Sequence, residues 1–451
     1  MDSLTIGLTG LGVLVALIAI RIPIAYAMIL VGGVGTAVLN GWPIVLSQLK
    51  DLAYAQFSNY DLSVVPLFVL MGAIASRTGL SADLFRAANA WLGWMRGGVA
   101  MSAIAACAGF GSVCGSSLAT ASTMGRVALP ELKKYRYSDR LATGTIAAGG
   151  VLGILIPPSV VLIIYAIIVE ANVVTMFMAA LLPGLIAVAL FLLTILAYTT
   201  LAPGSGPSGQ RASRAELVSA TLAISPVLVV FAAVIGGLYF GLFNPTPAAA
   251  VGVVMVALIG LLRGKLTLVE TREALLETAR TTGMIFLILL GAELLKIFMA
   301  RGGVPQVMAE MMANSGLAPM TTLILLLAAL ILLGCLMDSL SMILLAIPFF
   351  WPVLVEINGG DWATAAESPF GMTTEDLKIW FGILALIVVE LGLITPPVGM
   401  NVFIISAQAP DVPMRDTFLG VLPFFVAELL RVALLLAVPG LVFILPGLVG
   451  S

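Results

Sequence analysis

Histidine is absent from this 451-residue chain, and both cysteine, with three residues, and charged residues, at 10%, are scarce. Without histidine, the chain cannot form a Ser-His or Cys-His catalytic dyad, a histidine metal site or a histidine proton relay. Cys107, Cys114 and Cys335 lie in apolar segments, where cysteine usually packs as a small buried hydrophobe. A net charge of −2 argues against a nucleic-acid partner. The sequence has no G-x-x-x-x-G-K-[ST] loop, so nothing in it supports an ATPase.

Apolar residues dominate the composition of the chain. They make up 61% of the chain, whereas a soluble domain carries roughly 25% charged residues. Apolar runs of about twenty residues, long enough to cross a hydrocarbon core, recur along the whole length. The 46 glycines and 24 prolines suit broken, closely packed membrane helices. The sequence therefore predicts an all-α, multi-pass integral membrane protein whose first apolar run is retained, because no basic segment precedes it.

Two pairs of apolar segments are each too short to cross and are joined by a polar elbow. The first elbow begins at Gly115-Ser116-Ser117 and the second contains Asp338. Such a pattern predicts a re-entrant helical hairpin, which is tolerated in a membrane only inside protein or beside a cavity. The arms are residues 99–111 and 119–129 in the first pair, and residues 320–336 and 341–355 in the second.

Two longer apolar runs are broken by proline pairs. Gly153-x-x-x-Pro157-Pro158 in residues 141–169 matches Gly392-x-x-x-Pro396-Pro397 in residues 379–406. Prolines remove helix hydrogen bonds and free the carbonyls before them. Because each half then has five crossings plus one hairpin, the second half is expected to be inverted relative to the first. Inverted repeats with paired broken helices indicate a secondary transporter with its site near the bilayer midplane.

The repeat divides the chain into segments. Basic clusters place the linker between the halves in the cytoplasm. Amphipathic arms at residues 43–59 and 265–280 are expected to lie in the membrane interface. The predicted fold is an inverted-repeat, elevator-type transporter with about ten to eleven transmembrane helices plus two re-entrant hairpins. Its segments are scaffold spans and an arm (1–98), hairpin 1 with a broken helix (99–171), a last span (172–201), the linker (202–216), scaffold spans and an arm (217–301), hairpin 2 with a broken helix (302–410) and a last span (411–451).

The elbows predict two cation sites. Carbonyl and hydroxyl oxygens without imidazole or thiolate favour a hard cation such as Na⁺ or Li⁺. Asp338 is the one acid in either elbow; it is expected to bind the cation, to cap the following helix, or to do both. The candidate ligands are Gly115, Ser116, Ser117, Thr120, Gly153 and Ile156 for the first site, and Asp338, Ser339, Ser341, Gly392 and Thr395 for the second.

The same elbows offer free N–H groups and a positive helix end, which favour a carboxylate substrate. Asn401 follows the second proline pair and either faces the same cavity or packs between helices. Hydroxyl residues beyond the elbow, such as Ser122 and Thr123, are read as packing residues. The candidate substrate-binding residues are Ser116, Ser117, Pro157, Pro158, Pro396, Pro397 and Asn401.

Other charges lie within apolar runs. Glu293 with Lys296, and Glu428 with Arg431, are spaced i, i+3 and can neutralise each other on one helix face. Binding to substrate or to a partner subunit is the alternative for both pairs. Glu390 is a further intramembrane acid.

Several motifs together resemble the large membrane subunit of TRAP (tripartite ATP-independent periplasmic) transporters, over nearly the whole chain. These motifs are Arg21-Ile22-Pro23-Ile24-Ala25, Gly115-Ser116-Ser117-x-Ala119-Thr120, Gly153-x-Leu155-Ile156-Pro157-Pro158-Ser159, Asn244-Pro245-Thr246-x-Ala248-Ala249-Ala250 and Gly392-x-Ile394-Thr395-Pro396-Pro397-x-Gly399-x-Asn401.

The resemblance implies a non-enzymatic secondary transporter of the bacterial or archaeal inner membrane. It implies an elevator mechanism and Na⁺-coupled uptake of a small organic acid, with Na⁺ as coupling ion and no cofactor. It also implies two partners: a periplasmic substrate-binding protein, which largely sets specificity, and a small membrane subunit, expected here as a separate chain docked on the scaffold and interfacial arms.

Three other functions compete with this one. A binding-protein-independent antiporter or exporter of organic acids would share the architecture. An ion channel is a further alternative, but two proline-broken helices, each paired with a hairpin, suit alternating access better. An intramembrane hydrolase using Asp338 or Ser117 lacks both histidine and a second membrane aspartate.

Overall fold

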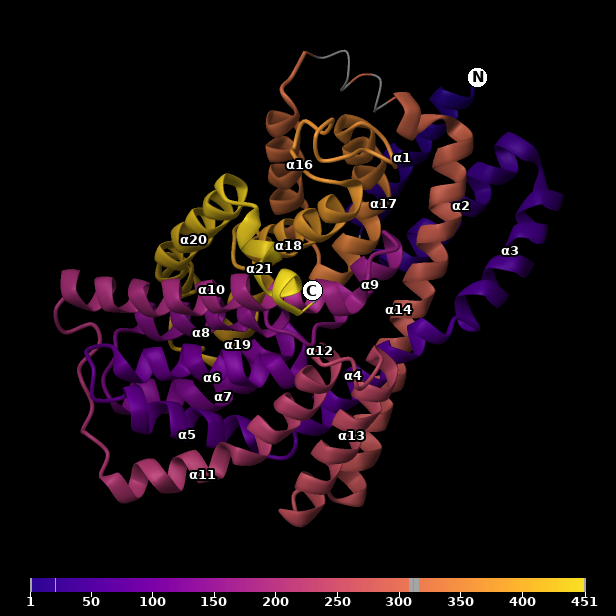
Figure 1. Ribbon diagram of the computed structural model, residues 1–451. Coiled ribbons are helices and arrows are strands. Elements are labelled where there is room, and N and C mark those ends of the chain that lie inside the picture. Colours follow the sequence, from indigo (N-terminus) through magenta and orange to yellow (C-terminus); the bar gives the residue numbers. More distant parts are fainter. Residues whose placement is uncertain (1, 21, 308–310, 312–315, 450–451) are drawn as a thin grey trace.

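The computed structural model describes residues 2–20, 22–307, 311 and 316–449. Within these ranges every regular element is a helix (Figure 1). The first half contains α1 (Ser3–Ala19), α2 (Ile24–Asn40), α3 (Trp42–Phe57), the 3-10 helix η1 (Tyr60–Ser63), α4 (Val64–Ala75), α5 (Leu80–Leu92), α6 (Gly98–Cys114), α7 (Ser117–Lys134), α8 (Asp139–Leu155), α9 (Val160–Ile168) and α10 (Val173–Leu201).

The second half follows a segment without helix, residues 202–213. It contains α11 (Arg214–Phe231), the π-helix η2 (Ala232–Gly236), α12 (Gly237–Tyr239), α13 (Pro245–Leu262), α14 (Leu268–Gly302), α16 (Pro319–Gly334), α17 (Ser339–Asn358), α18 (Thr374–Gly392), α19 (Met400–Gln408), α20 (Met414–Ala437) and α21 (Gly440–Val449).

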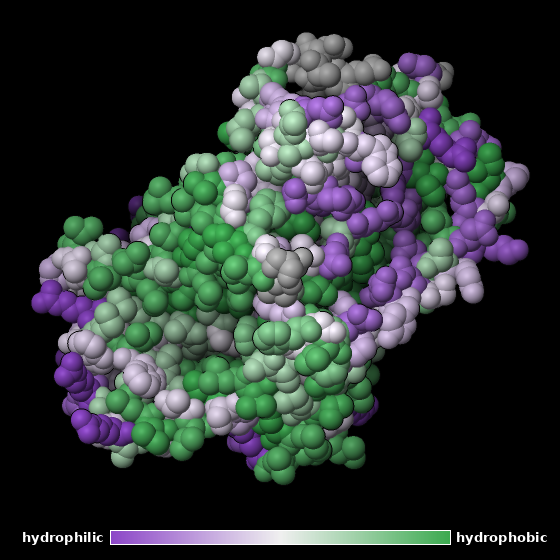
Figure 2. Space-filling view, in the orientation of Figure 1, coloured by the Kyte–Doolittle hydropathy of each residue, from purple (hydrophilic) through white to green (hydrophobic). Residues whose placement is uncertain are grey.

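Six helices in the described residues are long and apolar enough to cross a membrane, and the number rises to eight if each of two bent pairs counts as one span. Apolar side chains cover much of the visible surface over α11 and α13 (Figure 2). Leu222, Leu228 and Leu258 there are each more than half exposed, as expected of side chains that face lipid. The chain is therefore a multi-pass membrane protein.

The helices form two packed groups (Figure 1). In one group α14 packs along α2, α4 and α1, and α13 packs on α4. In the other, α8 packs against α6, α7 and α20, and α18 packs against α16. The two groups touch where α4 meets α6 and α9, and where α14 meets α17. The second group contains both predicted hairpins and both broken helices.

The two hairpins enter this second group from opposite ends of the broken helix α8–α9. The base of the α6–α7 hairpin lies at the start of α8, because only residues 135–138 separate the end of α7 from α8. The base of the α16–α17 hairpin lies at the start of α18, where Asn358 Nδ2 donates to Thr374 Oγ1 over 3.2 Å. That start is joined to the end of α9 by a hydrogen bond of 3.4 Å from Lys378 Nζ to Glu170 O. The turns of both hairpins therefore point toward the middle.

The predicted breaks are present at both proline pairs. α8 ends at Leu155 and α9 begins at Val160, with a bend of 47° between them. α18 ends at Gly392 and α19 begins at Met400. Both Pro-Pro peptide bonds are cis.

The arm predicted at residues 265–280 is not a separate element. It forms the first half of the 35-residue helix α14, which continues into the predicted span. This stretch has no proline, and Gly283 alone lowers helix propensity by about 1 kcal/mol, too little to end a helix rich in Leu, Ala, Glu and Arg. The arm of the first half is separate, because the chain bends by 55° between α3 and the helix that ends at Ala75.

The linker between the halves packs against the base of hairpin 1. Gly97 N donates to Gly206 O over 3.0 Å, and Ser138 N donates to Ser205 O over 2.9 Å. The guanidinium of Arg211 lies 4.6 Å from the ring centre of Trp94. At the end of α7, Lys133 forms an ion pair of 2.7 Å with Asp411, and its hydrogen bond holds the pKa of that carboxyl below its ordinary value. The linker and the polar ends of several helices thus share one side of the molecule.

Candidate functional site

The first hairpin turns at residues 115–120, here called tip 1. α6 ends at Cys114, and Gly115 turns the chain with φ = +64°, a value that favours glycine. A Cβ on Gly115 would also lie 2.8 Å from Pro158 O. Ser116 then caps α7, because its Oγ accepts from Ala119 N over 3.4 Å. The glycine–serine elbow of the sequence is thus a helix end followed at once by a helix start.

Tip 1 packs closely on the first broken helix, as the sequence predicts. A Cβ on Gly153 would lie 2.4 Å from Thr120 Oγ1 and 2.7 Å from Ser116 O. Thr120 is fully buried, and its Oγ1 has no hydrogen-bond partner within the described ranges. Ile156 and both prolines, Pro157 and Pro158, are buried beside it.

The second hairpin turns at residues 338–341, here called tip 2. Asp338 Oδ2 accepts from Ser341 N over 3.1 Å, so Asp338 caps α17. That confirms the capping role predicted for this acid and leaves its cation role a prediction. A Cβ on Gly392 would lie 2.5 Å from the carbonyl carbon of Gly334, so the second hairpin also meets its broken helix through two glycines.

The second proline pair is placed differently from the first. Pro396 and Pro397 are exposed. Thr395 Oγ1 donates to Leu391 O over 2.6 Å. Thr395 and Pro396 line a separate apolar cavity against Phe418 and other residues of α20. These residues do not join tip 2 in this conformation.

Asn401 lies against α8 one turn before Gly153, since a Cβ on Gly150 would lie 3.0 Å from its Nδ2. It is fully buried, and its Nδ2 donates to Ala147 O of α8 over 3.3 Å. Its Oδ1 has no partner among the described residues. Asn401 therefore joins α19 to α8 in this structure.

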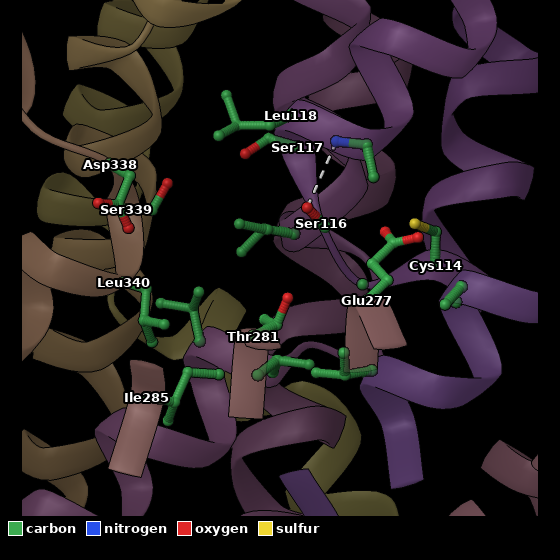
Figure 3. A pocket seen from close by; sticks show the side chains of 18 of the residues that line it. Cys114, Ser116, Ser117, Leu118, Glu277, Thr281, Ile285, Asp338, Ser339 and Leu340 are labelled. Atoms are coloured by element: carbon green, nitrogen blue, oxygen red, sulfur yellow. Dashed lines mark hydrogen bonds between the residues drawn. The ribbon is translucent and has the colours of Figure 1, made fainter. Parts of the chain in front are cut away.

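One cavity of about 210 Å³ brings the two tips together. In Figure 3, Asp338 and Ser339 face Ser117 and Leu118 across it, and Thr281 and Ile285 of α14 line a further side. Glu277, also on α14, lies near tip 1 and forms an ion pair of 2.8 Å with Arg77 of the segment after α4. The cavity is therefore bounded by both hairpins and by the other helix group.

Glu390 on α18 is the residue whose role sequence reasoning missed. It is fully buried, and its Oε1 accepts from Ser117 Oγ over 3.3 Å and from Ser339 Oγ over 2.5 Å. One carboxylate oxygen thus joins tip 1 to tip 2. A signal existed in the sequence: an acid in an apolar run, without a basic residue three or four positions away, is a functional candidate by default.

The other intramembrane charges pair as predicted. Arg431 and Glu428 are fully buried and contact each other directly, and Arg431 Nη1 donates to Pro183 O of α10 over 3.1 Å. Lys296 and Glu293 are partly exposed and lie 3.7 Å apart. Both pairs therefore neutralise themselves on one helix face.

The chemistry of the tips is that of oxygen ligands. The lining includes the hydroxyls of both tips, the Asp338 carboxylate at tip 2 and the Glu277 carboxylate of α14, and the cysteine that lines it is buried. Within the described ranges, no group of three or more His, Cys, Asp or Glu residues could hold a metal ion. Oxygen atoms of this kind suit a hard monovalent cation better than a transition metal.

A family model described as the DctM component of tripartite ATP-independent periplasmic transporters matches residues 11–441. This chain belongs to that family. It is 31% identical over 407 residues to the C4-dicarboxylate TRAP transporter large permease protein DctM of Pseudomonas aeruginosa, covering 89% of this chain and 91% of that protein.

Other relatives carry different substrate names. The sialic acid TRAP transporter large permease protein SiaM of Vibrio cholerae is 29% identical, over 94% of this chain and 95% of that protein. The isethionate TRAP transporter permease protein DctMQ of Oleidesulfovibrio alaskensis is 25% identical, over 94% of this chain and 64% of that protein. Relatives within this TRAP permease family are thus named for three classes of anion.

Two solved structures share the fold. The YdaH transporter of Alcanivorax borkumensis aligns with a TM-score of 0.63 at 15% identity, over 88% of both chains. MtrF of Neisseria gonorrhoeae aligns with a TM-score of 0.56 at 14% identity, over 88% of this chain and 84% of that one. At such identities the likeness concerns architecture alone.

Proposed function

We propose that this TRAP permease couples Na⁺ entry to the uptake of a small organic anion across the bacterial inner membrane. A periplasmic binding protein delivers the anion, and a small membrane subunit completes the transporter. The observation that carries this proposal is the cavity where two oppositely directed hairpin tips meet. Buried helix ends facing one cavity are the membrane form of an ion and anion site.

The architecture supports alternating access by an inverted repeat. The hairpins enter from opposite ends of α8–α9, and each second arm packs on the far half of the other broken helix, α7 on α19 and α17 on α9. The group of hairpins and broken helices meets the group built on α14, α2, α4 and α13 through few helices. In an elevator mechanism, the group with the hairpins and broken helices would slide as a unit against the other group, carrying the cavity across the membrane.

Two cation sites follow from the tips. At the first, the oxygens of tip 1 lie against Gly153, with the unpaired Thr120 hydroxyl between them. At the second, Asp338, Ser339 and Ser341 belong to tip 2, and the first arm of that hairpin ends at the contact between Gly334 and Gly392. Bound Na⁺ would hold each tip on its broken helix and so complete the cavity for an anion. The names of the relatives make a C4-dicarboxylate, sialic acid or isethionate the first substrates to try.

Uptake by reconstituted protein tests this function. The chain and the small subunit are placed in liposomes, the cognate binding protein is added outside, and entry of radiolabelled succinate, sialic acid or isethionate is followed. Entry should require both an inward Na⁺ gradient and the loaded binding protein. Entry that ignores Na⁺ would refute the coupling, and entry or exit without any binding protein would favour the antiporter or exporter.

Asp338→Asn separates the two roles of Asp338. Asparagine caps helices about as well as aspartate, so the start of α17 should persist, while the charge is lost. We expect the Na⁺ concentration for half-maximal uptake to rise about tenfold or more, because hydrogen bonds and contacts of charged groups contribute roughly 1.5–3 kcal/mol. Asp338→Ala, which loses both the cap and the charge, should also lower thermal stability. Unchanged Na⁺ activation in Asp338→Asn would remove Asp338 from the cation site.

A further inference from the structure

The Glu390 carboxylate contacts matched positions in the two hairpins. Its partners Ser117 and Ser339 each follow the residue that caps the second arm, Ser116 in tip 1 and Asp338 in tip 2. Glu390 itself lies two residues before Gly392, where α18 packs on Gly334. A single buried oxygen, Oε1, therefore fixes the separation of the two tips from a rigid helix.

The direction of these hydrogen bonds decides what the serines can offer to the cavity. A serine hydroxyl has one hydrogen to donate and two acceptor lone pairs. When Glu390 is ionised, both hydroxyl hydrogens are directed to its Oε1, so the two serine oxygens present only lone pairs to the cavity. Ser117 and Ser339 both line the cavity between the tips. Their oxygens are thereby set to attract a cation and not to donate to an anion.

The charge of Glu390 has no direct counter-charge. No Lys or Arg in the described part of the chain lies within ion-pair distance of it, and its Oε2 accepts no hydrogen bond there. Arg431, the nearby buried cation, already contacts Glu428 and Pro183 O. When Glu390 is ionised, these three buried groups carry two negative charges and one positive charge, an excess of one negative charge. A buried charge without a partner is costly, and a cation held by the serines would compensate it.

We propose that Glu390 is a positioning and counter-charge residue for the coupling cation. It orients the Ser117 hydroxyl at the first cation site and the Ser339 hydroxyl at the second, and so makes closure of both tips depend on cation binding. This inference rests on the proposed Na⁺ coupling and adds a residue, a geometry and a charge balance to it.

Glu390→Gln tests the inference with little change of shape. The amide keeps one acceptor oxygen but loses the charge, and its NH₂ group donates. We expect the Na⁺ concentration for half-maximal uptake to rise about tenfold or more, the factor equivalent to losing one charge-assisted interaction of roughly 1.4 kcal/mol. At saturating Na⁺, half-saturation by the loaded binding protein should change less than about twofold. Glu293→Gln on α14, which makes the same exchange away from the tips, is the matched control.

The effect of Na⁺ on the melting temperature separates a positioning role of Glu390 from a purely structural one. Na⁺ should raise the melting temperature of the purified wild-type complex, and Glu390→Gln should lose this shift while its melting temperature without Na⁺ stays close to that of wild type. A lowered melting temperature with the full Na⁺ shift retained would overturn the proposal, because it would mean that Glu390 only supports the fold.

The serines provide variants that leave the acid in place, in case Glu390→Gln does not fold. Ser339→Ala should raise the Na⁺ requirement, and adding it to Glu390→Gln should change little, because residues in one network are not additive. Unchanged Na⁺ dependence in Ser339→Ala and Ser117→Ala would overturn the proposal. A wild-type complex with no Na⁺ dependence would instead refute the Na⁺ coupling itself.

Discussion

Gly153→Ala is expected to reduce uptake by about 100-fold, the loss that a displacement of about 1 Å at a working site can cause. The new methyl group would meet Thr120 Oγ1 at 2.4 Å and Ser116 O at 2.7 Å, and the second of these atoms is backbone. Tip 1 must then move away from the broken helix α8–α9. Since both groups belong to the first proposed cation site, Na⁺ activation should be lost together with the rate. Uptake and its Na⁺ dependence in liposomes measure both effects.

Alanine substitutions at two other glycines control for the effect of an added methyl group. Gly33 on α2 and Gly283 on α14 have no atom within 4 Å of an added Cβ, so alanine there should leave uptake near that of wild type. Wild-type uptake in Gly153→Ala, at equal amounts of protein in the membrane, would show that the close packing of tip 1 on α8 is not needed for transport.

Arg431→Met is expected to destabilise the protein by about 3–5 kcal/mol, because it leaves Glu428 as a buried charge without its partner. The side chains of Arg431 and Glu428 are both buried from solvent, and the guanidinium also donates a hydrogen bond to Pro183 O. Glu428→Gln alone should lower the stability less, since Arg431 keeps its hydrogen bond to the carbonyl of Pro183. Thermal unfolding of the purified chain in detergent, followed for each variant, measures the losses.

The double variant Glu428→Gln with Arg431→Met decides whether the pair is structural. Removing both charges should recover a large part of the stability lost in Arg431→Met, and uptake should recover with it. If the double variant regains stability but not uptake, the pair has a role in transport beyond neutralising itself. If it is no more stable than Arg431→Met, self-neutralisation does not explain the pair.

Much of the fold follows from local chemistry. Proline pairs at 157–158 and 396–397 end helices whatever surrounds them, and Gly115 permits the positive φ that ends α6. The last span of the first half, expected at residues 172–201 from its apolar run, is the helix α10, Val173–Leu201. The continuity of α14 was missed because a change from polar to apolar composition was read as a boundary, although nothing in that stretch breaks a helix.

The centre of the site could not be predicted in the same way. Glu390 is 273 positions from Ser117 and 51 positions from Ser339, so no local pattern joins them. The repeat also suggests more symmetry than exists. Pro157 and Pro158 are buried beside tip 1, whereas Pro396 and Pro397 are exposed, and Asn401 is held by α8. Sequence matching finds related positions, but only packing of distant helices decides which of them reach the cavity.

The central claim is that Na⁺ and the anion cross together through the cavity between the tips. The most direct measurement is the entry of radioactive Na⁺ into liposomes that contain the chain and its small subunit, with the loaded binding protein outside. Na⁺ should enter only when the anion enters, and both fluxes should fall together in Gly153→Ala. Anion entry without accompanying Na⁺ entry in the wild-type complex would contradict this claim.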